Sequence, residues 1–100
     1  IYVDDIADAC VYFMKKKSDH IIINIGTGKD YSIKEYAQLV LKTIIPDRKI
    51  KIKYDLSKPN GTPKKVLDIN LAKKYGWKSK TNLKNSILET YEFFLRDKNL

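Results

Sequence analysis

The sequence predicts a single α/β domain, residues 1–100, built from short strands and about four helices. Two segments have strand patterns: residues 21–25 are a β-branched run, and residues 49–54 alternate strictly between lysine and apolar side chains. Four further segments carry apolar residues at helical spacing. One hundred residues, 43% of them hydrophobic, can bury one modest core. The strands are too few for a complete doubly wound sheet, so we expect a smaller lobe of α/β type.

The first helix is expected to follow a strand end at residues 1–3. Asp4 or Asp5 can cap it, because a carboxylate there accepts hydrogen bonds from free amides. The helix is expected to run to about Lys16, with a basic last turn that suits its dipole. Its inward face is expected to consist of Ile6, Ala9, Cys10, Phe13 and Met14.

A second helix is expected between two strands. Residues 21–25 predict a buried strand, and residues 49–54 predict a half-exposed one. Between them, Ser32 and Glu35 have capping-box spacing, and Pro46 ends the helix. The inward side chains are expected to be Ile33, Tyr36, Ala37, Val40, Leu41 and Ile44 of the helix, and Ile50, Ile52 and Tyr54 of the second strand.

The last third of the chain is expected to be mainly helical. Residues 66–67 favour a very short strand, and residues 68–75 a short helix that Gly76 ends. Asn82 is expected to cap the last helix. The inward face of this helix is expected to be Leu83, Ile87, Tyr91, Phe94 and Leu95.

A basic, proline-containing loop is the most informative stretch of the chain. Pro59-Asn60-Gly61 predicts a tight turn, because proline fixes φ and both Asn and Gly tolerate positive φ. Pro63 favours an extended residue before it. A stiff loop loses little entropy on binding, so it suits an anionic ligand such as a diphosphate; a merely solvated basic loop is the alternative. Its three cations are Lys58, Lys64 and Lys65.

Four segments together resemble GDP-L-fucose synthases, the GDP-4-keto-6-deoxymannose epimerase/reductases of the extended short-chain dehydrogenase family. Residues 58–68 resemble their Lys-Pro-Asp-Gly-Thr-Pro-Arg-Lys-x-Leu-Asp segment, which points to this branch. Residues 2–5 are similar to the His-Val-Asp-Asp segment, and residues 24–28 to the Asn-Ile-Gly-Ser/Thr-Gly turn, which many sugar-nucleotide enzymes share. Gly76-Trp77 is similar to the Leu-Gly-Trp segment.

The resemblance implies a C-terminal substrate-binding lobe of an extended Rossmann-type, NAD-dependent epimerase/dehydratase enzyme. The complete protein would epimerise two ring carbons of GDP-4-keto-6-deoxymannose and reduce the 4-keto group with NADPH, giving GDP-L-fucose. An N-terminal half would supply the NADP-binding Rossmann domain and a Ser/Tyr/Lys catalytic set, so we expect this chain alone to be inactive. The resemblance also implies a homodimer, and the single cysteine, Cys10, fits a reducing compartment, so we expect a cytoplasmic enzyme.

The resemblance assigns substrate binding to four residues of the basic loop. Lys65 occupies the position of a lysine that lies near the nucleotide sugar, where it would contact phosphate or sugar hydroxyls. Lys64 replaces the usual arginine, so it keeps the charge and loses the bidentate fork. Asn60 replaces the usual aspartate and cannot supply a negative charge. Lys58 is the weakest candidate and has a solvated alternative.

Other residue patterns favour structural roles. Gly26-Thr27-Gly28 lacks the third glycine of a dinucleotide fingerprint, so we expect no cofactor site in this chain. Asp4 and Asp5 are adjacent and suit helix capping better than acid–base catalysis. His20 has no clustered ligand residues, so we expect no metal. Packing roles are expected for Cys10 and Trp77, the latter as an anchor for the last two helices.

The charge of the chain leaves two alternative functions open. A net charge of +8 makes an RNA- or polyanion-binding module one alternative. The basic residues of the chain are scattered, and they are eighteen lysines and only two arginines, which disfavours nucleic-acid binding. A sister enzyme acting on another GDP-4-keto sugar, such as a deoxyheptose, fits the changes at Asn60 and Lys64. One cysteine excludes an intrachain disulfide, and no apolar run approaches the roughly 20 residues of a membrane span.

Overall fold

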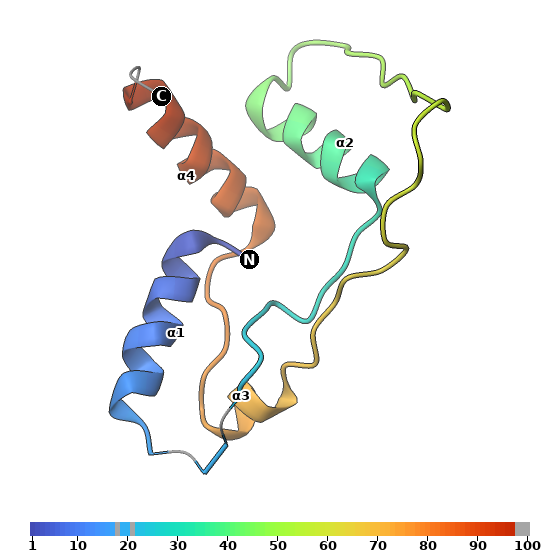
Figure 1. Cartoon of the computed structure of the whole chain (residues 1–100). Coiled ribbons are helices and arrows are strands. Elements are labelled where there is room, and N and C mark those ends of the chain that lie inside the picture. The colour runs from blue at the N-terminus through green and yellow to red at the C-terminus, as the bar shows by residue number, and fades with distance from the viewer. Residues whose placement is uncertain (18, 21, 98–100) are drawn as a thin grey trace. The chain divides into compact units, whose positions relative to one another are not determined.

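The chain forms two compact units with two helices in each (Figure 1). The computed structural model describes residues 1–17, 19–20 and 22–97. Unit 1 combines residues 1–29 with residues 66–83, and unit 2 combines residues 30–65 with the described residues from Lys84 onward. The helices are α1 (Val3–Lys15) and α3 (Asn70–Lys74) in unit 1, and α2 (Ile33–Ile44) and nearly all of α4 (Leu83–Arg96) in unit 2.

The expected number of helices is confirmed, but the expected strands are wrong. Within the described part of the chain, the expected strands at residues 1–3, 22–25, 49–54 and 66–67 show no strand structure, and helix α1 already begins at Val3. Ile21, the first residue of one expected strand, lies outside the described residues. A strand is stabilised by hydrogen bonds to a neighbouring strand, and neither unit pairs these segments with one. Their β-branched and alternating patterns are therefore present without the sheet that such patterns favour.

Helix α1 buries a different face from the expected one. Ala9 is buried and Phe13 half-buried, as predicted, but Cys10 and Met14 are exposed, the latter by 85%. The buried polar residue of the helix is Asp5, one turn before Ala9. Neither Asp4 nor Asp5 caps the helix, because the N-cap is Tyr2 and it makes no side-chain cap bond. The expected apolar face is thus rotated toward the side that carries Asp5.

Helix α2 begins at the capping box that the sequence predicts. The Glu35 amide donates to Ser32 Oγ at 3.1 Å, and the Ser32 amide donates to Glu35 Oε2 at 2.6 Å. The hydrogen bond from the Ser32 backbone amide, and to a smaller extent the interaction with the Ser32 side chain, stabilise the Glu35 carboxylate and lower the pKa of Glu35. On the expected apolar face, Ile33 is 80% exposed and Val40 is also exposed. The half-buried members of that face are Tyr36, Ala37, Leu41 and Ile44.

Helix α3 is shorter than expected and ends at Gly76 as predicted. Asp68 precedes the helix and accepts a hydrogen bond from the Asn70 amide at 2.9 Å. Gly76 has φ of 90°, a left-handed conformation that glycine adopts without steric cost. The Gly76 amide donates to Lys73 O at 2.9 Å, and the Trp77 amide donates to Ala72 O at 3.0 Å. These bonds reverse the chain direction and direct Trp77 back onto the helix.

Helix α4 begins directly after Asn82, where the sequence places its start. Leu83, Ile87 and Tyr91 are half-buried as expected. Phe94 and Leu95, expected on the same inward face, are 58% and 49% exposed. The C-terminal half of this helix therefore leaves apolar side chains at the surface.

The core of unit 1 is small and consists of Ala9, Ala72 and Trp77. Four half-buried side chains pack against it, namely Tyr12, Phe13, Ile23 and Ile25. Two alanines allow α1 and α3 to approach the indole ring closely, so the single tryptophan fills most of the core. The prediction that Trp77 anchors helices by packing is therefore confirmed for α3. No described helix has the length and apolar character that crossing a membrane requires.

Candidate functional site

The lysine loop, residues 57–65, contains all four residues predicted to bind substrate. It lies in unit 2 and has no helix or strand structure. Lys58, Asn60, Lys64 and Lys65 are all exposed. No side-chain hydrogen bond or ion pair holds the three lysines among the residues that the structure describes. The loop therefore offers three solvated ammonium groups that can turn toward an anion.

The turn that orients this loop lies earlier than predicted. The Asp55 carboxylate accepts hydrogen bonds from the Ser57 amide at 3.0 Å and from Ser57 Oγ at 2.6 Å. The Lys58 amide also donates to Asp55 O, at 3.4 Å. A tight turn with positive φ was expected at residues 59–61. Neither Asn60 nor Gly61 has a positive φ, since Gly28 and Gly76 are the residues with positive φ in the described chain. The Asp55 side chain imitates a backbone turn and takes over that role.

The bonds from Ser57 also affect the charge of Asp55. The side-chain bond and then the backbone bond stabilise its carboxylate, so they lower its pKa. Asp55 is thus ionised at neutral pH and holds the start of the loop. Gly61 is open to solvent, because a Cβ built on it would meet no atom within 4 Å. A ligand could approach the backbone at Gly61 closely.

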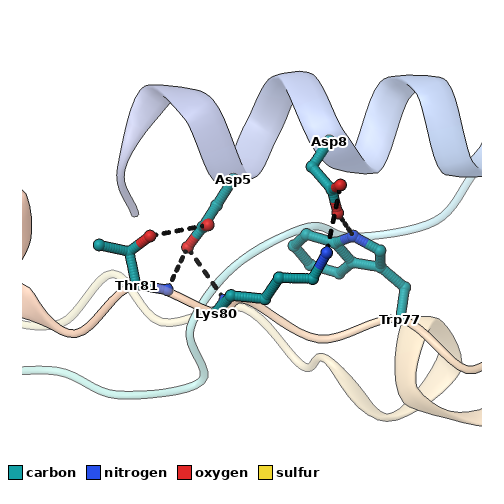
Figure 2. Close-up of polar contacts among 5 residues, drawn as sticks. All are labelled: Asp5, Asp8, Trp77, Lys80 and Thr81. Atoms are coloured by element: carbon teal, nitrogen blue, oxygen red, sulfur yellow. Dashed lines mark hydrogen bonds and ion pairs between the residues drawn. The ribbon is translucent and has the colours of Figure 1, made fainter.

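A second polar cluster joins α1 to the segment that follows α3 (Figure 2). Asp5 is 5% exposed, and its carboxylate accepts three hydrogen bonds in all. The donors are the Lys80 amide at 3.2 Å, the Thr81 amide at 3.0 Å and Thr81 Oγ1 at 3.0 Å. A buried carboxylate needs such donors, and buried backbone amides need an acceptor. Asp5 is therefore a structural clamp within unit 1, and its burial with occupied oxygens does not suit acid–base catalysis.

Asp8 extends this clamp by one helical turn, as Figure 2 shows. Its Oδ2 accepts a hydrogen bond from Trp77 Nε1 at 2.9 Å, and its Oδ1 lies 3.3 Å from Lys80 Nζ. The bond from Trp77, and then the bond and charge of Lys80, lower the pKa of Asp8. Both charged side chains are partly solvated, so the ion pair itself adds little stability. The indole bond fixes the orientation of the ring that fills the core.

These carboxylates predict loss of stability in acid. Asp8, Glu35 and Asp55 have lowered pKa values, so their bonds stabilise the fold fully above the unfolded value of about 4 and progressively less below it. The urea midpoint should be similar at pH 7 and pH 5 and lower at pH 3. Asp8→Asn should show a shallower fall between pH 5 and pH 3. Parallel falls for wild type and Asp8→Asn would contradict this role of Asp8.

The glycine turn in unit 1 serves packing and does not fit a dinucleotide. Gly28 has φ of 72°, and a Cβ built on it would meet Ile69 Cδ1 at 2.6 Å. A Cβ on Gly26 would meet Ile69 Cγ2 at 3.6 Å. A dinucleotide fingerprint also needs a third glycine three residues after Gly28, where this chain has Tyr31. The turn therefore lets residues 26–28 lie against Ile69.

The remaining polar candidates have structural partners. His20 Nδ1 lies 2.8 Å from Tyr75 Oη, and Tyr12 Oη donates to Tyr75 O at 2.6 Å. These contacts join Tyr75, at the end of α3, to Tyr12 of α1 and to His20, which follows α1. The described residues contain no group of three or more His, Cys, Asp or Glu side chains that could hold a metal ion. Cys10, expected to pack inward, is exposed and free.

Sequence reasoning missed the Asp5 cluster. Asp5 and Thr81 are 76 residues apart, and no local rule connects them. The sequence did contain one indication of this cluster, because Asp5 lies one turn before Ala9 on the same side of α1. An acidic residue beside a buried alanine indicates a buried acceptor that needs donors from another segment.

Comparison with known proteins supports the resemblance found from the motifs. GDP-L-fucose synthase 1 of Arabidopsis thaliana is 35% identical over 97% of this chain and 29% of its own length. GDP-L-fucose synthase of Sinorhizobium fredii is 38% identical over 95% of this chain and 30% of its own length. GDP-L-colitose synthase of Yersinia pseudotuberculosis is 36% identical over 99% of this chain and 32% of its own length.

These matches confirm that the chain is homologous to GDP-L-fucose synthases along nearly all of its residues. The chain spans about 30% of the length of the curated relatives it matches. No family model and no solved structure matches the chain.

Proposed function

We propose, from its homology to GDP-L-fucose synthases, that this chain is the GDP-sugar-binding part of a longer enzyme of that type. The complete enzyme converts GDP-4-keto-6-deoxymannose to GDP-L-fucose by epimerisation at two ring carbons and NADPH-dependent reduction of the 4-keto group. Within it, residues 1–100 form one substrate-binding lobe, and the enzyme is a homodimer. This chain alone has no reductase activity.

One observation supports the proposal above the others: the segment that most resembles fucose synthases is an exposed loop with three unpaired cations. Lys58, Lys64 and Lys65 carry no ion pair among the described residues, so binding an anion breaks no existing contact. A diphosphate carries two or more negative charges, and charge-assisted bonds to it are stronger than neutral ones.

The four predicted residues have different roles in this proposal. Lys65 contacts the phosphates or sugar hydroxyls of the substrate as a point charge. Lys64 adds charge without the bidentate geometry of the arginine that it replaces. Asn60 accepts and donates hydrogen bonds at the sugar nucleotide but supplies no negative charge. Lys58 contributes a solvated charge at the loop entrance.

The residues present do not fit a dinucleotide cofactor, so we assign NADPH and the Ser/Tyr/Lys catalytic set to the rest of the longer protein. The glycine turn at residues 26–28 lacks the third glycine of a dinucleotide fingerprint, and Tyr31 stands in its place. The contribution of this chain is then to hold the substrate. Positioning a substrate can lower the activation barrier by several kcal/mol. In well-oriented intramolecular reactions the gain reaches roughly 7–11 kcal/mol.

A sister activity on another GDP-4-keto sugar is the second candidate, because the chain is also similar to a GDP-L-colitose synthase. Asn60 and Lys64, which depart from the fucose synthase motif, fit such a change. A deoxyheptose is one further sugar of this kind. The two candidates share fold, cofactor and the lysine loop, and differ in the sugar that the complete enzyme reduces.

Asn60→Asp tests which sugar this site is built for. In the complete enzyme, we expect the change to raise turnover of GDP-4-keto-6-deoxymannose about two- to tenfold, because it restores a charged acceptor. NADPH oxidation at 340 nm measures this for the fucose precursor and for the colitose precursor. Asn60→Ala is the control for losing the side chain. A wild type that turns over the colitose precursor faster than the fucose precursor, and loses that preference in Asn60→Asp, would favour the second candidate.

A further inference from the structure

A groove of about 540 Å³ lies in unit 2, apart from the lysine loop. Helix α2 lines one part of it, and the irregular segment at residues 45–54 lines the rest. None of the four residues proposed to bind the GDP-sugar belongs to its lining. Its volume falls in the range of roughly 300–1,000 Å³ that is typical of small-molecule sites.

Four cations line this groove, and no carboxylate does. They are Lys34 and Lys42 of α2, with Arg48 and Lys49 of the following segment. Like charges around one concave surface repel one another and raise its positive potential, which an anion relieves. Four cations exceed what a single carboxylate ligand would neutralise. The match in charge is to a polyvalent anion such as a diphosphate or triphosphate.

The groove also has an apolar wall, which inorganic phosphate would leave exposed. Leu41 and Ile45 come from the end of α2 and the residue after it, and Ile52 from the second segment. Tyr54 lines the same groove and is 59% exposed, so much of its ring is free to meet a ligand. A planar base can lie on aliphatic and aromatic side chains while its phosphates reach the cations.

We infer that this groove binds a nucleoside diphosphate or triphosphate. Its phosphates contact Arg48, Lys42 and Lys49, and its base lies against Ile52 and Tyr54. The Gln38 amide and the Tyr54 hydroxyl are the neutral polar groups of the lining that can hydrogen-bond the base, so selection among purines is weak. This site stands on the groove alone and does not depend on the sugar-nucleotide function of the lysine loop.

Calorimetric titration of the full chain with ADP in about 0.15 M salt tests the site, because ADP lacks the guanine and sugar of the proposed substrate. We compare three double variants that each remove two positive charges. The groove pair is Lys42→Gln with Arg48→Gln, and the loop pair is Lys64→Gln with Lys65→Gln. The control pair, Lys15→Gln with Lys17→Gln, changes exposed lysines of unit 1. Circular dichroism verifies that each variant keeps its helices.

We expect the groove pair to weaken ADP binding about tenfold or more, and the control pair to change it less than about twofold. Inorganic pyrophosphate should bind more weakly than ADP, because it leaves Tyr54 and the apolar wall uncovered. Equal weakening by the groove and control pairs would mean non-specific attraction to a basic chain and would overturn the site. So would weakening by the loop pair alone, absence of ADP binding, or equal affinity for pyrophosphate and ADP.

Discussion

Lys65→Ala is expected to lower kcat/KM of the complete enzyme for GDP-4-keto-6-deoxymannose about 10- to 100-fold. A charge-assisted contact to phosphate contributes about 1.5–3 kcal/mol, and that range corresponds to these factors. The KM for NADPH should stay within about twofold, because the lysine loop is assigned to substrate and not to cofactor. Steady-state kinetics with each substrate varied in turn measure both constants.

Lys53→Ala is the matched control for this change. Lys53 is another exposed lysine of unit 2, and it lies outside both the lysine loop and the lining of the groove between α2 and residues 45–54. Its removal should change kcat/KM less than about twofold, since isolated surface charges contribute little. If Lys65→Ala raised the KM for NADPH as much as that for the sugar nucleotide, the assignment of the loop to the substrate side would be wrong.

Asp5→Ala is expected to destabilise the chain by about 2–4 kcal/mol. The change removes a carboxylate that is 5% exposed and accepts three hydrogen bonds, and it leaves the part-buried amides of Lys80 and Thr81 without that acceptor. Trp77 is the single tryptophan of the chain and is 4% exposed, so its fluorescence reports unfolding of unit 1. Urea titration followed at the tryptophan emission gives the change in unfolding free energy.

Asp4→Ala is the control, because Asp4 is the exposed neighbour in the same helical turn. Its loss removes a favourable charge near the helix N-terminus, which is worth about 0.3–1 kcal/mol. Thr81→Val should have an intermediate effect, since it removes one of the three donors and leaves the two amide bonds in place. Equal destabilisation by Asp5→Ala and Asp4→Ala would show that Asp5 is no clamp and acts only through its charge.

The sequence was sufficient for features that depend on neighbours in the chain. The capping box of Ser32 and Glu35 and the helix end at Gly76 involve residues at most a few positions apart, and both are formed. The start of α2 follows the same local rules, and α4 begins directly after Asn82, as expected. Such contacts form whenever their own short segment folds, so a single sequence contains all the information that they need.

Features that depend on distant partners could not be predicted in this way. The patterns at residues 22–25 and 49–54 favour strands, but a sheet forms only where such segments pair with a neighbouring strand. The apolar pattern of α1 placed Cys10 inward, whereas the contacts of Asp5 with Lys80 and Thr81 turn another side toward the core. A buried acceptor with its donors 75 or 76 positions away overrides the local hydrophobic pattern.

The lysine loop lies between these cases. Its exposure and lack of regular structure follow from its proline and lysine content, and the structure agrees. Its turn is made by Asp55 and Ser57, because a carboxylate two residues before a free amide and hydroxyl forms a competing turn. The predicted binding residues thus keep their accessibility, although the backbone feature that presents them differs from the predicted one.

NADPH oxidation by the complete protein, with the sugar product identified by NMR, tests the central proposal most directly. With GDP-4-keto-6-deoxymannose as substrate, we expect stoichiometric NADPH consumption, GDP-L-fucose as product, and a 10- to 100-fold loss of kcat/KM in Lys65→Ala. Full activity of Lys65→Ala, or NADPH oxidation supported equally by UDP- and GDP-linked keto sugars, would contradict the account of the lysine loop as a GDP-sugar site.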